Sequence, residues 1–123
     1  MHIASTVCGQ IAEEKDGCDT VAALLPAGTL SGAPKFRACE IIDELEKEPR
    51  GIYGGAIGYM DFSGNLDVCI AIRTAVKKGN KVYVQAGAGV VADSVPEKEY
   101  EECAHKAGAV MNAIIRASEV NGR

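Results

Sequence analysis

Two glutamates and a lysine in the last third of the chain have the spacing of groups on one face of a helix. Glu99, Glu102 and Lys106 are three and four positions apart, which places them on the same side of an α-helix. Carboxylates at i and i+3 can hold Mg²⁺, a hard ion that prefers oxygen ligands and keeps several waters. The alternative is a solvated acidic face, because Glu97 and Glu101 lie in the same stretch. On the residues alone, the solvated face is the preferred interpretation.

Arg73 is a candidate for binding a carboxylate. It lies in a predicted strand between Ala71 and Ala75, whose small side chains leave space on that face. A guanidinium is always charged and offers a planar fork of donors. The alternative is that Arg73 is an ordinary surface residue or forms an ion pair with a nearby acidic side chain.

The segment QAGAG at residues 85–89 is a candidate for close approach by a ligand. Alternating glycines remove side chains from one face of a strand, so backbone N–H groups become available to an anion or to another backbone. The spacing also resembles a dinucleotide fingerprint, but Ser94-Val95-Pro96 precedes the next predicted helix and no βαβ unit follows. A nucleotide site is therefore not expected here.

The loop GTLSGAPK at residues 28–35 resembles a phosphate-binding loop only superficially. Its second glycine is followed by alanine and proline, where a Walker A motif needs lysine and a hydroxyl residue. The loop can offer hydroxyl and backbone donors to an oxyanion, or it can simply cap the helix that follows. Of the two histidines, His2 can act as a general acid or base or be structural, and His105 is interpreted as a surface residue.

The elements that must position these residues are predicted to form an α+β fold, an antiparallel sheet layered with helices. Helices are expected at 17–25, with Asp19 as N-cap, at 34–47 and at 95–118, with a capping box at Ser94–Glu97. Strands are expected at 2–11, 52–62, 66–77 and 81–91. The last three should pair antiparallel in that order, with helix 95–118 packed against them, and the first has no sequential partner.

Composition excludes several classes of protein. The chain of 123 residues is 47% hydrophobic, 24% charged and carries a net charge of −4, so it should fold, and it has no basic stripe for binding nucleic acid. No apolar run approaches the roughly 18 residues of a membrane span, and the N-terminus does not have the pattern of a signal peptide. Five cysteines without a C-x-x-C pair predict reduced thiols in a cytoplasmic protein.

Five motifs in fixed order resemble the chorismate-binding fold of anthranilate synthase component I, over residues 1 to about 116. They are MHIAS (1–5), PAGTLSGAPK (26–35), YGGAIGY (53–59), CIAIRT (69–74) and QAGAGVVADS (85–94). The wider family includes relatives that make aminodeoxychorismate, isochorismate or salicylate. The resemblance is specific because the motifs are several and their order is kept.

The resemblance implies roles for individual positions. Chorismate and its carboxylates would be bound by Tyr53, Arg73, Gly87, Ala88 and Gly89. Glu102 matches a direct Mg²⁺ ligand, and Glu99 matches an acidic neighbour that holds the waters of the metal. Three further residues match catalytic positions of the family's active site. Thr29 matches a residue that lines the pocket, and Lys106 matches a pocket lysine. His2 matches the histidine implicated in loss of the substrate hydroxyl and in the later elimination.

The implied reaction converts chorismate and ammonia to anthranilate and pyruvate in tryptophan biosynthesis, with Mg²⁺ as cofactor. A partner subunit, the glutamine amidotransferase component II, would supply the ammonia. The first alternative is aminodeoxychorismate synthase of the folate pathway, in which pyruvate stays attached; the order GTLS at 28–31 favours anthranilate, since the other branch more often exchanges Ser and Thr. The others are a non-catalytic remnant of the fold and a nucleotide-binding domain.

The family is much longer than this chain and uses upstream glutamates to complete its metal site. Met1 resembles an internal methionine of such a chain. We therefore expect residues 1–123 to be the C-terminal portion of a chorismate-binding domain, inactive when isolated.

Overall fold

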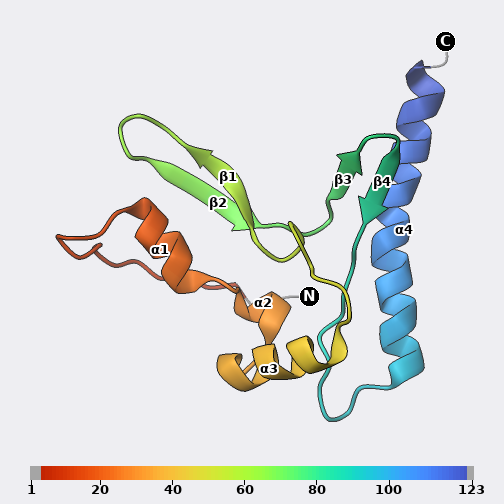
Figure 1. The fold of residues 1–123 in the computed structure, drawn as a ribbon, viewed down its shortest axis with the longest axis horizontal. Helices are drawn as coiled ribbons and strands as arrows, with labels where there is room; N and C mark the ends of the chain where they lie inside the picture. Colours follow the sequence, from red (N-terminus) through yellow and green to blue (C-terminus); the bar gives the residue numbers. More distant parts are fainter. Residues whose placement is uncertain (1–3, 122–123) are drawn as a thin grey trace.

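The computed structural model describes residues 4–121. Four helices are present in this part of the chain: α1 (Gly17–Leu24), α2 (Gly28–Ser31), α3 (Lys35–Leu45) and α4 (Pro96–Asn121). Four strands lie between α3 and α4: β1 (Ala56–Met60), β2 (Leu66–Ile70), β3 (Ala75–Lys78) and β4 (Lys81–Val84). The mixture of helices and antiparallel strands is the α+β fold that the sequence predicted (Figure 1).

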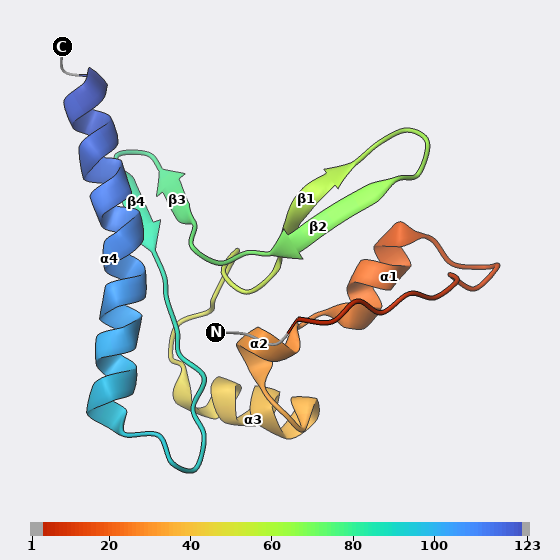
Figure 2. The same ribbon diagram turned by 180° about the vertical axis from the view of Figure 1, so that it is seen from behind.

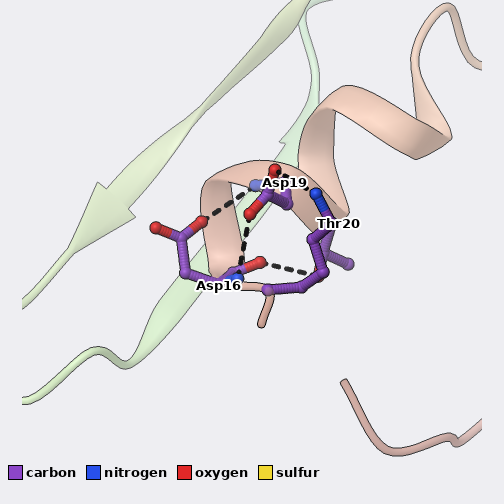
Figure 3. Close-up of polar contacts among 4 residues, drawn as sticks. Asp16, Asp19 and Thr20 are labelled. Atoms are coloured by element: carbon purple, nitrogen blue, oxygen red, sulfur yellow. Dashed lines mark hydrogen bonds and ion pairs between the residues drawn. The ribbon is translucent and has the colours of Figure 1, made fainter. Parts of the chain in front are cut away.

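Helix α1 begins at Gly17, as predicted, but its N-cap lies three residues before the predicted one. Asp16 is the N-cap, and its carboxylate accepts a hydrogen bond from the N–H of Asp19 at 2.9 Å, while the Asp19 carboxylate accepts one from the N–H of Asp16 at 3.1 Å (Figure 3). The Thr20 hydroxyl also donates to the carbonyl of Asp16 at 3.0 Å. The assignment of Asp19 as N-cap was therefore wrong: two aspartates three apart form a reciprocal capping box, in which Asp19 occupies the third position.

The predicted strand at 2–11 does not form over residues 4–11, which contain no regular element. A strand needs a neighbouring strand to receive its backbone hydrogen bonds, and none of the described strands pairs with this segment. The β-branched composition of the segment was thus insufficient to predict a strand.

The strands form two separate hairpins instead of one three-stranded sheet. β1 pairs antiparallel with β2, from Ala56 opposite Ile70 to Met60 opposite Leu66. β3 pairs antiparallel with β4, from Ala75 opposite Val84 to Lys78 opposite Lys81. The predicted order and direction of pairing were correct, but the strand expected at 66–77 is interrupted at residues 71–74, which separates the hairpins (Figures 1 and 2).

The interruption has a local cause in the backbone. Arg73 has φ 54°, in the left-handed region, where a continuous strand cannot pass. Ala71 completes the first hairpin: it donates to the Gly55 carbonyl at 2.9 Å and accepts from the N–H of Gly54 at 3.0 Å. Ala71 is also fully buried, whereas strict alternation had assigned it to the open face.

Helix α4 lies beside β4 in both views and contacts that strand (Figures 1 and 2). Packing of this helix on the sheet was predicted, and it is found for the second hairpin. The Ser94 hydroxyl accepts a hydrogen bond from the N–H of Val91 at 3.0 Å, and the helix begins at Pro96. No hydrogen bond joins Ser94 to Glu97 between residues 4 and 121, so the predicted capping box was wrong, because the serine closes the preceding turn instead.

The described chain buries few side chains. Ala71 is the one fully buried hydrophobic residue among those described, and large apolar side chains such as Phe36, Phe62 and Leu45 are 87%, 113% and 74% exposed. The accessible surface is 10726 Å², against about 6,300 Å² for a compact monomer of this mass. Over residues 4–121 no helix combines the length and the apolar character that a bilayer crossing requires.

Candidate functional site

One cavity of about 470 Å³ collects most of the candidate residues. Its walls come from α2, from the end of α3 and the turn after it, from the break between β2 and β3, from the segment after β4, and from α4. The lining residues are Thr29, Leu30, Glu46, Arg50, Tyr53, Ile72, Arg73, Gln85, Ala86, Gly87, Ala88, Gly89, Glu102 and Lys106. Segments up to 77 positions apart in sequence therefore meet at a single hollow, as Thr29 and Lys106 show.

Arg73 reaches this cavity because the strand breaks around it. The left-handed backbone at Arg73 ends the regular alternation of β2, and the side chain lines the hollow together with its neighbour Ile72. A non-glycine residue in this conformation is uncommon and costs free energy. The strain falls on the residue whose chemistry is best suited to binding a carboxylate, which is where strained backbone tends to be found.

Lys106 links helix α4 to the glycine segment. Its ammonium group donates to the carbonyl of Gly87 at 3.0 Å and forms an ion pair with the carboxylate of Glu102. The hydrogen bond from Lys106, then its charge and, less strongly, the charge of Arg73 lower the pKa of Glu102 below its ordinary value. Glu102 is therefore ionised at neutral pH, and the cavity holds both cations close to one carboxylate.

Tyr53 and the glycine segment face each other closely. A Cβ atom placed on Gly87 would lie 3.1 Å from the Tyr53 hydroxyl oxygen, whereas one on Gly89 would meet nothing within 4 Å. A larger residue at position 87 would therefore require the Tyr53 hydroxyl to shift by a few tenths of an ångström. No hydrogen bond between described residues uses the N–H groups of 87–89, so these donors are available to a ligand.

Arg50 and Glu46 also line the cavity, and the sequence interpretation missed both. Arg50 donates from Nε and Nη2 to the two carboxylate oxygens of Glu46, at 2.8 Å and 2.5 Å, and from Nη1 to the carbonyl of Leu30 at 2.6 Å. Hydrogen bonding in this pair lowers the pKa of Glu46 and raises the pKa of Arg50. The spacing i, i+4 indicates a pair only on a helix, and both residues lie beyond Leu45, where α3 ends.

Two predicted site residues are not placed in the cavity. Glu99 lies half-buried on α4, one turn before Glu102, and is not among the lining residues. His2 lies outside the described residues, so its role stays a prediction. Within residues 4–121 no three His, Cys, Asp or Glu side chains gather closely enough to hold a metal ion.

Comparisons with known proteins agree on one family. The family model described as chorismate binding enzyme matches residues 1–112. The chain is 62% identical over 120 residues to anthranilate synthase component 1 of Acetivibrio thermocellus, covering 98% of this chain and 24% of that protein. It is 59% identical over 119 residues to the protein of the same name from Aquifex aeolicus, covering 97% and 24%.

A solved structure gives the same result. The crystal structure of anthranilate synthase component I from Streptococcus pneumoniae superposes with a TM-score of 0.80 at 51% identity, over 83% of this chain and 23% of that one. The chain therefore spans about a quarter of the length of the proteins that it matches.

Proposed function

The chain belongs to the family of chorismate-binding enzymes, and we propose that it forms one wall of the site in which an anthranilate synthase component I converts chorismate and ammonia to anthranilate and pyruvate. In this proposal residues 1–123 are the C-terminal portion of a larger chorismate-binding domain. The observation that carries it is the meeting of Arg73, Lys106 and the free N–H groups of 87–89 at one cavity.

These donors suit a small dianionic substrate. Chorismate bears two carboxylates, and a guanidinium binds a carboxylate through two parallel charge-assisted hydrogen bonds. Adjacent backbone N–H groups at 87–89 form a second anion-binding surface. The hydroxyl of Tyr53, close to Gly87, would then fix the orientation of the ring between the two.

The carboxylates of α4 are chemically suited to Mg²⁺. Glu102 opens onto the cavity and is ionised, because its pKa is lowered, and Glu99 lies one turn away on the same helix. We infer that Glu102 holds the ion directly and that Glu99 holds its waters, with further ligands from substrate and from protein beyond the described residues. The bound ion would supply positive charge beside a substrate carboxylate.

The reaction needs proton transfers that the chain's own residues can serve. The substrate hydroxyl must receive a proton to leave as water when ammonia adds, and a ring proton must be removed when pyruvate departs and the ring becomes aromatic. His2 is the proposed proton carrier, on the strength of the resemblance. Thr29 lines the cavity and is proposed to orient the substrate, and Lys106 keeps both Gly87 and Glu102 in place.

Ammonia is proposed to come from a glutamine amidotransferase subunit. The relatives named anthranilate synthase component 1 carry a component number, which indicates a second component.

The test uses a chain of the relatives' full length that carries these residues, supplied with chorismate, Mg²⁺ and ammonium. Anthranilate is followed by its fluorescence, and pyruvate by a coupled reduction. We expect both products in equal amounts, strongly reduced in Arg73→Lys, which lacks the planar fork, and unchanged in the matched control Arg37→Lys, on the exposed side of α3. Consumption of chorismate without release of pyruvate would favour aminodeoxychorismate synthase and contradict the proposal.

A further inference from the structure

We propose that Arg50, held by Glu46, is a positioning residue that fixes Thr29 and Tyr53 on the wall of the chorismate site. The inference rests on the proposed function for the identity of the substrate. Its structural part rests on the three hydrogen bonds of the Arg50 guanidinium and is tested separately below.

Helix α2, which carries Thr29, cannot hold its own position. It has four residues, and its N-cap, Ala27, provides no side-chain hydrogen bond. So short a helix is unstable alone, because nucleation costs more than its few hydrogen bonds return. External contacts must therefore fix it. Among the described residues, the bond from Arg50 to the Leu30 carbonyl is the one side-chain hydrogen bond that α2 receives from another segment, and it is short and charge-assisted.

The same residue controls the turn that carries Tyr53. The carbonyl of Arg50 accepts a hydrogen bond from the N–H of Tyr53 at 3.1 Å. The side chain of Leu30 lies 3.7 Å from where a Cβ of Gly54 would be. Thr29 and Tyr53 are therefore connected through Arg50 by its side chain on one side and its backbone on the other.

The role depends on the shape of the guanidinium more than on its charge. The Glu46 and Arg50 side chains are 39% and 27% exposed, so solvent weakens the attraction between their charges, whereas the two parallel hydrogen bonds add a fixed geometry. A fork that is locked by two bonds to Glu46 can point its remaining nitrogen at Leu30 in only one direction. Lysine keeps the charge but is a flexible point donor, so it cannot hold Glu46 and the Leu30 carbonyl in this geometry.

The first experiment measures order and needs no activity. In Arg50→Lys and Glu46→Gln, we expect hydrogen–deuterium exchange to accelerate about tenfold at residues 30–31 and 53–55. Arg37→Lys is the matched control, because Arg37 is also an arginine paired with glutamate, in its case Glu40 and Glu44 of α3, but lies outside the cavity. Unchanged exchange at these residues in Arg50→Lys, or an equal acceleration in the control, would overturn the inference.

The second experiment measures coupling in the full-length enzyme. Arg50→Lys should raise KM for chorismate about tenfold. Its effect on the unfolding midpoint should be smaller than that of removing a buried core side chain. In the Thr29→Val background the same change should have less than about a threefold effect, because a residue acting through Thr29 loses its means of action. Independent, multiplicative effects would refute positioning. Absence of chorismate turnover in the wild-type enzyme would instead refute the proposed function and leave the exchange result to decide the inference.

Discussion

Replacing Arg73 with glycine should give a more stable fold than replacing it with alanine, and both changes should strongly weaken chorismate binding. The φ of 54° at Arg73 costs a residue with a Cβ about 1–2 kcal/mol, and glycine escapes this cost. Glycine also loses about 0.5–1 kcal/mol more conformational entropy than alanine on folding. Arg73→Gly should therefore be about 0.5–1 kcal/mol more stable than Arg73→Ala, although both lack the guanidinium.

The loss of binding can be estimated from the same residue. A charge-assisted hydrogen bond contributes about 1.5–3 kcal/mol, so losing both bonds of a bidentate contact should cost at least about 3 kcal/mol. This corresponds to about 100-fold in kcat/KM. Arg73→Gly and Arg73→Ala should share this loss, because backbone strain does not contribute to it.

The assay combines denaturant unfolding, followed by circular dichroism, with anthranilate fluorescence. Arg37 supplies a control of opposite sign. It lies in the first turn of α3, where Arg37→Gly should be less stable than Arg37→Ala, by up to about 1 kcal/mol, with kcat/KM unchanged. If the Arg73→Ala variant proves as stable to denaturant as Arg73→Gly, the strain argument fails. If either variant keeps kcat/KM within about threefold of wild type, Arg73 does not bind the substrate.

Three further predictions follow from the site. Gly87→Ala should displace the Tyr53 hydroxyl, 3.1 Å from the new Cβ, and lower both the unfolding midpoint and, about tenfold, kcat/KM; adding Tyr53→Phe, which removes the hydroxyl, should restore the midpoint, and no restoration would contradict the contact. In Lys106→Met the pKa of Glu102 should rise towards its ordinary value of 4.5, measured by carbon NMR titration, and an unchanged pKa would refute the pairing. Because the folded pKa of Glu102 lies below its unfolded value, its contribution to stability is present above pH 4.5 and is lost as the pH falls through the folded pKa. This dependence should become smaller in the variant, where only the charge of Arg73 remains. A polypeptide of these 123 residues alone should form no anthranilate with chorismate, Mg²⁺ and ammonium, and should bind a hydrophobic dye; fluorescent product above background would refute this.

Helices were the part of the fold that the sequence predicted best. Helices were predicted at 34–47 and 95–118, and α3 and α4 have ends within about three residues of these ranges. In the first range apolar residues recur every third position, as one apolar helix face requires, whereas the capping box given for the second did not form. The break at 71–74 was not predictable in the same way. Alternation of side-chain types continues through it, and nothing in the residue type of Arg73 indicates a left-handed backbone.

The site was predicted as far as single residues reveal their chemistry. Arg73 and the glycines at 87 and 89 were raised by residue type and spacing, and Glu102 by helix geometry, and the structure places all four at one cavity. Arg50 was missed because its partner, the Leu30 carbonyl, is a backbone group 20 positions away. A side chain that acts through a distant carbonyl leaves no pattern in the local sequence.

The exposed surface of this chain affects both its stability and the strength of the charge interactions at the cavity. The accessible surface of 10726 Å² exceeds that of a compact monomer by about 4,400 Å², and the Glu102 side chain at the site is itself 54% exposed. A charge in contact with water interacts several times more weakly than one in a protein interior. Protein that covered the apolar faces around the cavity would therefore both supply the core that residues 4–121 do not form and exclude water from Arg73, Glu102 and Lys106. Folding and substrate binding should then be gained together, which is why both should be measured in a chain of the relatives' full length.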